Sequence, residues 1–266
     1  FIRIIFIYIF YIYIYMNYSD ISKDIYYMSG LEIQSVITRD TIKRLAKDVS
    51  NIVKNPLTDN GIYYVHDETN MLRGKACIVG PQNTPYEGGY YFFDFFFPHD
   101  YPNNPPKVLY YTNDGNTRFN PNLYKNGKVC LSVLNTWRGP QWTGCQSISS
   151  ILLCICGVVL TDIPLINEPG ITEKHRDFET YNKIITYKNY EVAIIDMLTR
   201  KDIETLFKPL MPDIIKHFKN NYSQILKNLE KVACKDVTLK TTIYNISANV
   251  KYDVVKEKLN KLYLSL

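Results

Sequence analysis

Residues 62–97 read IYYVHDETNMLRGKACIVGPQNTPYEGGYYFFDFFF, three apolar runs separated by turn-forming residues. The runs at 62–66, 72–79 and 90–97 are rich in β-branched and aromatic residues, which predicts three strands. A fourth strand is expected after the prolines of Tyr101-Pro-Asn-Asn-Pro-Pro106. Because strands that are neighbours in sequence usually pair, we predict a four-stranded antiparallel meander.

An amphipathic helix is expected just before the first strand. Between Thr38 and Val53 apolar residues recur at steps of three and four, the pattern of a helix with one buried stripe. The opposite side, here called the basic helix face, carries Lys43, Arg44 and Lys47. A basic face is usually only solvated, so a docking role for it needs a further argument.

More helices are expected after the sheet. Ser147 is a suitable cap for a strongly apolar helix that runs to Leu160, and two prolines between Asp162 and Gly170 prevent its continuation. From Phe178 onwards the pattern is helical again, so we expect the C-terminal quarter to consist of packed helices. The order of helix, meander, loops and helices predicts an α+β fold.

The composition is that of a globular protein. The chain has 266 residues, 46 % of them hydrophobic, and a formal net charge of +5. We expect three parts: an apolar leader at 1–32, a core at 33–180 and a helical extension at 181–266. The positive charge is spread along the chain without a long basic block, so nucleic-acid binding is not indicated.

The leader begins with an unusual segment, since Phe1 to Tyr15 are almost all apolar. A membrane-spanning helix needs about 20 apolar residues, and no small-residue cleavage site precedes Met16. We interpret this segment as upstream sequence outside the functional protein, with Met28 as a further candidate start, in preference to a membrane anchor.

The six cysteines lie at positions 77, 130, 145, 154, 156 and 234. They form no Cys-x-x-Cys pair and have no histidine at metal-ligand spacing, so neither a zinc site nor a disulfide framework is indicated. We therefore expect reduced thiols and a cytoplasmic location, with the nucleus left open as an alternative.

Cys130 is the candidate nucleophile, because it follows the turn-forming residues 120–127 and opens an apolar segment. A thiol at the end of a loop is expected to be held by backbone groups and to stay partly open to solvent. A free cysteine has a pKa near ~8.5, so a cysteine hydrolase would need a positioned histidine. None of the four histidines suits that role, since they lie in strand-like, turn or helical patterns at His66, His99, His175 and His217. A thiol that receives an activated acyl group by thioester exchange needs no strong base.

Five short motifs follow one another along the core. They are Tyr86-Glu-Gly-Gly-Tyr-Tyr-Phe, Phe97-Pro-His-Asp-Tyr-Pro-Asn-Asn-Pro-Pro-Lys-Val, Phe119-Asn-Pro-Asn-Leu-Tyr, Gly127-Lys-Val-Cys-Leu-Ser and Leu160-Thr-Asp with a following proline. In order and spacing they resemble the core of ubiquitin-conjugating (E2) enzymes over roughly residues 33–180. The loop 135–142 and the ending Asn167-Glu-Pro-Gly170 are similar to the large Z-type conjugating enzymes in particular.

This resemblance implies roles for particular residues. Cys130 would accept the C-terminal glycine of ubiquitin, or of a ubiquitin-like modifier, as a thioester and present it to a substrate lysine. Asn122 matches the Asn of the family's His-Pro-Asn motif, which stabilises an oxyanion or holds the active-site loop, and a simple turn asparagine is the alternative. Asn120 replaces the histidine of that motif. Glu168 aligns with an acid that orients or deprotonates the lysine, and a solvated loop acid is the alternative.

The resemblance also implies partners. The basic helix face matches the helix that docks the activating enzyme, where complementary charge speeds association. The positions of the family's apolar ligase anchor hold Asn103, Gly144 and Cys145, so docking of ordinary ligases is in doubt. ATP is consumed by the activating enzyme, so this chain is expected to need no cofactor and no metal.

Two other hypotheses stay open. The first is a non-catalytic module that keeps the fold in order to hold ubiquitin or a ligase, and the presence of Cys130 argues against it. The second is a membrane-tethered adaptor, which rests only on the apolar leader.

Overall fold

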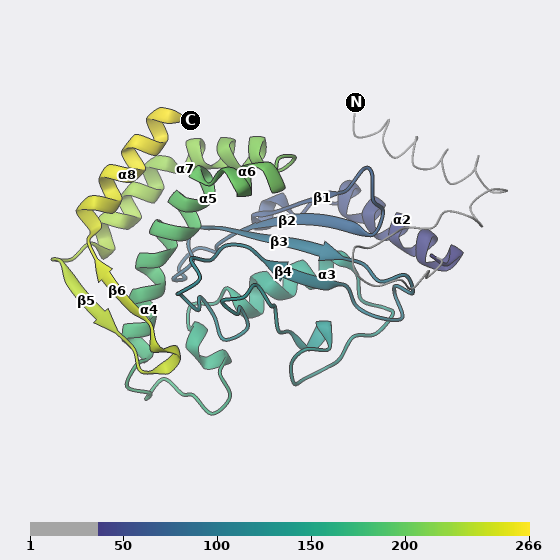
Figure 1. Cartoon of the computed structure of the whole chain (residues 1–266), viewed down its shortest axis with the longest axis horizontal. Coiled ribbons are helices and arrows are strands. Elements are labelled where there is room, and N and C mark those ends of the chain that lie inside the picture. The colour runs from purple at the N-terminus through teal and green to yellow at the C-terminus, as the bar shows by residue number, and fades with distance from the viewer. Residues whose placement is uncertain (1–36) are drawn as a thin grey trace.

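The computed structural model describes residues 37–266 and contains a four-stranded antiparallel sheet at its centre (Figure 1). The strands follow the chain order and are β1 (Ile62–His66), β2 (Arg73–Val79), β3 (Tyr90–Phe96) and β4 (Lys107–Tyr110). The predicted meander is confirmed, and the first three strands begin and end within one residue of their expected bounds. The leader and its predicted boundary at residue 32 lie outside the described residues.

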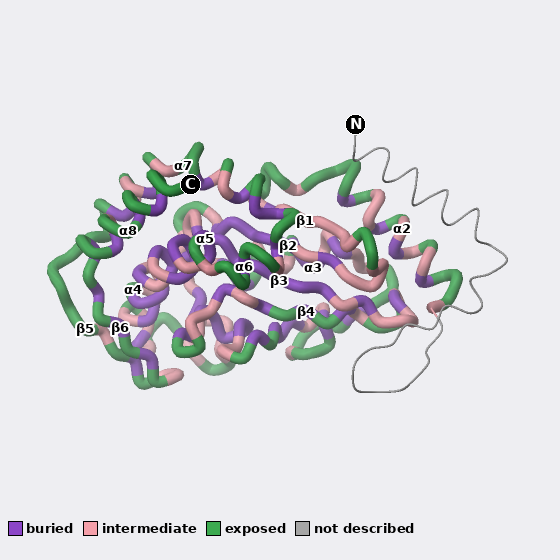
Figure 2. The backbone as a smooth tube through the Cα atoms, turned by 45° about the horizontal axis from the view of Figure 1, so that its top comes forward, coloured by how far each residue is buried: buried purple, intermediate pink, exposed green. Residues whose placement is uncertain are grey.

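The strand β3 is buried on both faces of the sheet. Tyr91 and Phe93 point to one face and Tyr90 and Phe92 to the other, and all four are 0 % exposed. Figure 2 shows this buried zone running through the middle of the sheet. A strand covered on both sides has no polar face, which explains why residues 90–97 read as a continuous apolar run rather than an alternating one.

Two helices flank the sheet in the core, as the sequence predicts. The helix α2 (Arg39–Lys54) is capped by Thr38, whose side chain accepts a hydrogen bond from the backbone N–H of Thr41. The helix α3 (Ile148–Cys154) begins at the expected cap Ser147 and continues as a π-helical turn through Ile155–Val159. The two helices contact each other.

The C-terminal extension is mainly helical. The helix α4 (Phe178–Lys188) continues as a π-helical segment over Asn189–Asp196, and the predicted boundary after residue 180 therefore falls inside a helix. The remaining helices are α5 (Met197–Thr199), α6 (Lys201–Leu206), α7 (Met211–Val232) and α8 (Tyr252–Ser265).

The extension covers part of one face of the sheet. Phe207, just after α6, is 0 % exposed, and its ring centroid lies 4.8 Å from that of Phe92. The Lys75 ammonium on β2 donates to the carbonyl of Leu206, which neighbours that ring. The core and the extension therefore share one continuous apolar interior.

The packed helices expected in the C-terminal quarter are confirmed, but a short sheet that the sequence pattern did not predict interrupts them. A two-stranded antiparallel sheet, β5 (Val237–Lys240) and β6 (Ser247–Val250), lies between α7 and α8. These strands have only four residues each, too few for an alternating pattern to stand out from the helical segments on either side. The residues 241–246 that join them are here called the hairpin turn.

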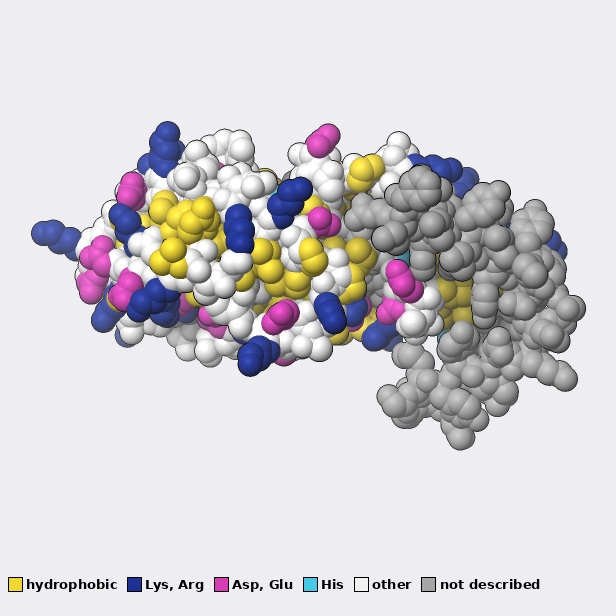
Figure 3. Space-filling model, turned by 90° about the horizontal axis from the view of Figure 1, so that it is seen from above, with side chains coloured by type: hydrophobic (Ala, Val, Ile, Leu, Met, Phe, Trp, Pro, Cys, Tyr) yellow, Lys and Arg dark blue, Asp and Glu magenta, His cyan; other side chains and the backbone are white. Residues whose placement is uncertain are grey.

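The surface carries mixed charge. On the face drawn in Figure 3, basic and acidic side chains are interspersed, with small apolar areas between them. No helix among the described residues combines the length and apolarity needed to cross a membrane.

Candidate active site around Cys130

Cys130 ends a tight turn of the backbone. Leu123 and Val129 form an antiparallel bridge, and the N–H of Tyr124 donates to the carbonyl of Lys128 at 2.9 Å. Gly127 has φ +86°, a conformation that favours glycine, and an added Cβ would lie 3.0 Å from the carbonyl oxygen of Tyr110. The turn residues that the sequence shows before Cys130 thus fold the chain back on itself.

Asn122 holds the backbone of Cys130 on both sides. The N–H of Cys130 donates to the Asn122 carbonyl at 2.9 Å, and the Asn122 Nδ2 donates to the Cys130 carbonyl at 2.6 Å. A flipped amide would bring two oxygens together, so the carbonyl fixes the orientation of this amide. The loop-holding role implied by the resemblance therefore has a direct structural basis, while the oxyanion role stays a prediction.

The thiol is less open than expected. Cys130 is 2 % exposed and Asn122 is 3 % exposed, so the expectation of partial exposure is wrong for this conformation. Because both backbone groups of Cys130 pair with a buried asparagine, the cysteine is drawn against the interior.

Asn120, at the position of the family's histidine, is a fully buried junction of hydrogen bonds. Its Nδ2 donates to the Tyr86 hydroxyl at 3.0 Å and to the Val159 carbonyl at 2.8 Å. Its Oδ1 accepts from the Asn122 N–H at 2.8 Å and from the Asn167 Nδ2 at 3.4 Å. This side chain thus links residues 118–130, here called the cysteine segment, to the loop that carries Glu168.

Glu168 is half-buried at the end of the 3₁₀ turn Pro164–Asn167. Its carboxylate accepts a short hydrogen bond from the hydroxyl of Tyr244, which lies 76 residues further along the chain in the hairpin turn. The preceding Asn167 donates to the Val158 carbonyl at 2.9 Å. Tyr244 is not among the site residues predicted from the sequence, since no local pattern marks a contact over such a separation.

Tyr244 also contacts the cysteine segment through its ring. The Arg118 guanidinium lies between two aromatic faces, 3.8 Å from the ring centroid of Tyr124 and 4.4 Å from that of Tyr244. The Tyr181 hydroxyl donates to the Arg118 carbonyl at 2.7 Å. Tyr124 belongs to the turn that precedes Cys130. The hairpin turn therefore contacts the candidate site twice, through the hydrogen bond from Tyr244 to Glu168 and through the packing of the Tyr244 ring on Arg118.

Asp177 fixes the hairpin turn to the core. Its Oδ2 accepts from the Thr242 N–H at 2.8 Å, the Thr242 hydroxyl at 2.6 Å and the Ile243 N–H at 2.9 Å. Burial alone would raise the pKa of this carboxyl, but the hydrogen bonds from Thr242 and Ile243 outweigh it, so the pKa lies below its usual value. The ionised form of Asp177 is therefore the one that stabilises the fold.

Asp177→Asn is expected to reduce the free energy of unfolding at pH 7 by about 1–3 kcal/mol, because charged hydrogen bonds are lost. With the folded pKa below the unfolded one, the stabilisation is present above the unfolded pKa and disappears as the pH falls through the folded pKa. The difference in melting temperature between wild type and D177N should then shrink between pH 7 and pH ~3. Asp236→Asn, at an exposed carboxylate, is the control, and a pH-independent difference for D177N would contradict the assignment.

The family model for ubiquitin-conjugating enzymes matches residues 44–187, a range that contains Asn122, Cys130 and Glu168. The chain belongs to the ubiquitin-conjugating enzyme family. It is 42 % identical over 196 residues to the human protein "Ubiquitin-conjugating enzyme E2 Z", covering 73 % of this chain and 52 % of that protein.

Other relatives give the same picture. The zebrafish (Danio rerio) E2 Z protein is 44 % identical over 167 residues, covering 62 % of this chain and 50 % of that protein. A probable ubiquitin-conjugating enzyme of Caenorhabditis elegans is 39 % identical over 174 residues, covering 61 % of this chain and 24 % of that protein. The chain thus spans about half the length of the E2 Z relatives it matches.

Within this member of the ubiquitin-conjugating enzyme family, the basic helix face divides into two parts. Lys43 and Lys47 are exposed on α2, one helical turn apart. Arg44 instead forms a salt bridge with the buried Asp48, with Nε 3.1 Å from Oδ1. Its other nitrogens donate to the carbonyls of two loop residues, Gly144 and Gln146. Arg44 thus ties α2 to the loop before α3.

The positions of the family's apolar ligase anchor lie on two neighbouring loops. Trp142 Nε1 donates to the Pro102 carbonyl at 2.7 Å, which holds the loops together. Asn103, Gly144 and Cys145 are all exposed there. The two loops thus form an exposed surface, but positions 103, 144 and 145 supply no large apolar side chain to it.

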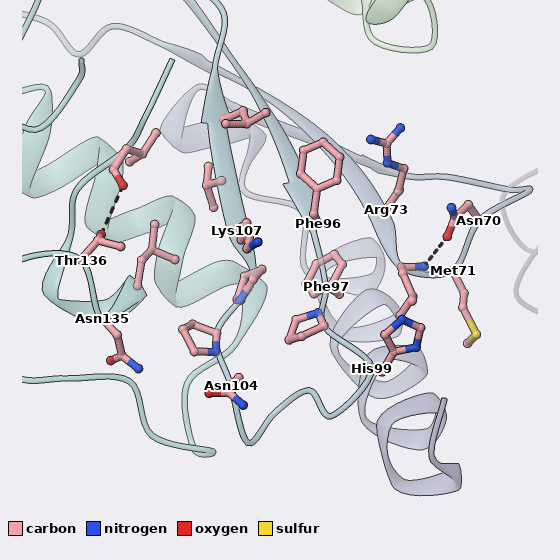
Figure 4. Close-up of a pocket in the computed structure, with 18 of the residues that line it drawn as sticks. Asn70, Met71, Arg73, Phe96, Phe97, His99, Asn104, Lys107, Asn135 and Thr136 are labelled. Atoms are coloured by element: carbon pink, nitrogen blue, oxygen red, sulfur yellow. Dashed lines mark hydrogen bonds between the residues drawn. The ribbon is translucent and has the colours of Figure 1, made fainter. Parts of the chain in front are cut away.

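A groove of about 770 Å³ lies beside the cysteine segment. It is lined by the ends of β2 and β3, by β4 and by residues on both sides of Cys130, at 128–129 and 134–136. In Figure 4, Thr136 and Asn135 stand on one side, Asn70 and Arg73 on the other, with Phe96 between them. The Arg73 guanidinium lies 4.2 Å from the Phe96 ring centroid. A basic side chain therefore packs on an aromatic ring in the lining of the groove.

Proposed function

We propose that this chain is an active ubiquitin-conjugating enzyme that carries ubiquitin, or a ubiquitin-like modifier, as a thioester on Cys130. The observation that carries this proposal is a free cysteine whose two backbone groups both pair with Asn122, inside the region matched by the family model. One of these bonds joins two backbone groups, and the other comes from the buried Asn122 side chain.

The proposed reaction has two acyl transfers. The Cys130 thiolate attacks the thioester of the activating enzyme, a new C–S bond forms and the activating enzyme's thiolate leaves. The neutral amine of a substrate lysine then attacks the Cys130 thioester, forms an amide bond and releases the Cys130 thiolate. Neither transfer changes the oxidation state of any atom.

Glu168 and Asn122 are the residues that we assign to the second transfer. A lysine has a pKa near ~10.4, so it must lose a proton before it attacks, and the half-buried Glu168 carboxylate would orient it and accept that proton. Asn122 Nδ2 uses one hydrogen on the Cys130 carbonyl, which leaves the second for the oxyanion of the tetrahedral intermediate.

The partners follow from the same proposal. They are the modifier, an activating enzyme, substrate proteins and a ligase whose docking does not depend on an apolar anchor at positions 103, 144 and 145. ATP is used by the activating enzyme, so the chain needs no cofactor of its own, and neither nucleic acid nor a membrane is a proposed partner. Six free cysteines, two of them exposed, support a reducing compartment such as the cytoplasm or nucleus.

The proposal is tested by incubating the protein with an activating enzyme, ATP and ubiquitin, followed by gel electrophoresis with and without thiol. A modified band that disappears under thiol is the expected result. Absence of such a band with every activating enzyme and modifier tried would contradict the proposal and favour the non-catalytic ubiquitin-binding alternative.

Reversing the charge of the two exposed lysines on the basic helix face should slow charging of Cys130 without affecting the later transfer to lysine. The double variant K43E/K47E is expected to lower the charging rate at subsaturating activating enzyme by roughly tenfold, because steering by complementary charge is lost, with a smaller effect at high salt. Initial charging rates at two ionic strengths measure this. The matched control is K227E/K231E, a pair with the same spacing on α7, and an equal loss in both variants would contradict docking at α2.

A further inference from the structure

We propose that Tyr244 is a positioning residue of the candidate active site, through which the C-terminal extension holds the Glu168 carboxylate in place for the incoming lysine. Tyr244 lies outside the range matched by the family model, which ends at residue 187. The inference rests on the proposed function of Glu168 and deepens it.

The hydroxyl of Tyr244 lies against the Glu168 carboxylate. It donates a short hydrogen bond to Glu168, and the adjacent Asn167 connects through Asn120 to the N–H of Asn122. Burial and the neighbouring Glu168 carboxylate raise the pKa of Tyr244, so the hydroxyl remains a donor throughout the physiological range. One carboxylate oxygen of Glu168 is thereby held by Tyr244, and the other can accept a hydrogen bond from the amine of the incoming lysine.

The backbone of the hairpin turn holds Tyr244 in an uncommon conformation. Tyr244 and Asn245 have φ values of 57° and 50°, and the left-handed conformation is rare for a bulky residue such as tyrosine. A residue keeps such a conformation only when its surroundings enforce it. Here the enforcement comes from Asp177, which accepts three hydrogen bonds from the two residues before Tyr244.

The ring of Tyr244 contributes separately from its hydroxyl. The ring packs on the Arg118 guanidinium at 4.4 Å and edge-on against Tyr181, with ring centroids 6.2 Å apart. Tyr244→Phe removes only the hydrogen bond to Glu168 and leaves these packing contacts intact. A single substitution can therefore separate the positioning of the acid from the stability of the turn.

The decisive measurement is discharge of the charged enzyme to two acceptors. Lysine needs a base to remove its proton, whereas hydroxylamine is already neutral at pH 7 and does not. We expect Y244F to slow discharge to lysine about tenfold, since general bases contribute ~10²–10⁴ and a misplaced one loses part of that. Discharge to hydroxylamine and charging by the activating enzyme should stay within about twofold of wild type, because neither step uses Glu168 as a base.

A double-mutant cycle shows whether Tyr244 acts through Glu168. If it does, Y244F in an E168Q background slows lysine discharge little further, because the group it positions is already disabled. The control is Tyr222→Phe, which removes a hydroxyl bond to Asn260 elsewhere in the extension and should discharge normally. Multiplicative effects of Y244F and E168Q, equal slowing with both acceptors, or faster discharge in Y244F would overturn the inference.

A second measurement needs no charging and so separates this inference from the proposed function. Backbone hydrogen exchange of the uncharged protein should become faster over residues 163–171 in Y244F, relative to wild type and Y222F, because the tether on Glu168 is lost. Unchanged exchange there would contradict the tether, even if the wild-type enzyme charges normally. A wild-type protein that never charges would contradict the proposed function and the positioning role with it.

Discussion

Replacing Cys130 with serine is expected to convert a thiol-sensitive adduct into an ester and to stop transfer to lysine. The hydroxyl still lies where Asn122 holds the backbone, so it can accept the modifier slowly. An alkoxide is a much poorer leaving group than a thiolate, so the ester survives thiol treatment and is cleaved by mild alkali. We expect lysine transfer to fall by about 10³-fold or more, as is typical when a nucleophile is removed.

The check is the charging assay on C130S with thiol, with alkali and with free lysine. Cys234→Ser is the matched control, since it removes an exposed thiol between α7 and β5 and should charge and discharge like wild type. A thiol-sensitive band of wild-type intensity in C130S would mean that another cysteine carries the modifier.

Asn122→Ala is the second large effect that we expect. It removes the donor to the Cys130 carbonyl and the proposed donor to the oxyanion, so lysine discharge should fall by ~10²–10³. Loss of one hydrogen bond from a buried carbonyl also reduces the free energy of unfolding by about 1–3 kcal/mol. Unlike Y244F, this variant should slow discharge to hydroxylamine as well, because every acceptor passes through the same oxyanion.

Single-turnover discharge and a melting curve separate the two consequences. The control is Asn126→Ala in the same turn, whose exposed side chain accepts only from the Lys128 N–H at 3.2 Å and should leave discharge within about twofold. A variant N122A that is destabilised but discharges at the wild-type rate would leave Asn122 with the loop-holding role alone.

Much of the core could be predicted because its signals are local. The strands β1 to β3 follow from runs of β-branched and aromatic residues bounded by turn residues. The start of α3 follows from the hydroxyl of Ser147, which accepts a hydrogen bond from a backbone group only three residues away. The link between Asn122 and Cys130 was an expectation from the family resemblance, and the structure brings the two together because they lie only eight residues apart across a tight turn.

Contacts between distant segments were not predictable from such patterns. The basic spacing on α2 suggests one docking face, yet Arg44 bonds to residues 100 and 102 positions away and so serves the fold. The four-residue strands β5 and β6 carry too short a pattern to be distinguished from the neighbouring helices. The burial of Cys130 likewise depends on how the surrounding loops pack, which its flanking residues do not encode.

The candidate nucleophile, the sheet and the cap of α3 are thus encoded in short stretches of chain, because hydrogen bonding and hydrophobic periodicity act over a few residues. The hydrogen-bond partner of Glu168 is not encoded locally. Tyr244 reaches it only because Asp177 fixes the hairpin turn and the extension packs on the core, and only the tertiary structure decides which side chains meet across 76 residues.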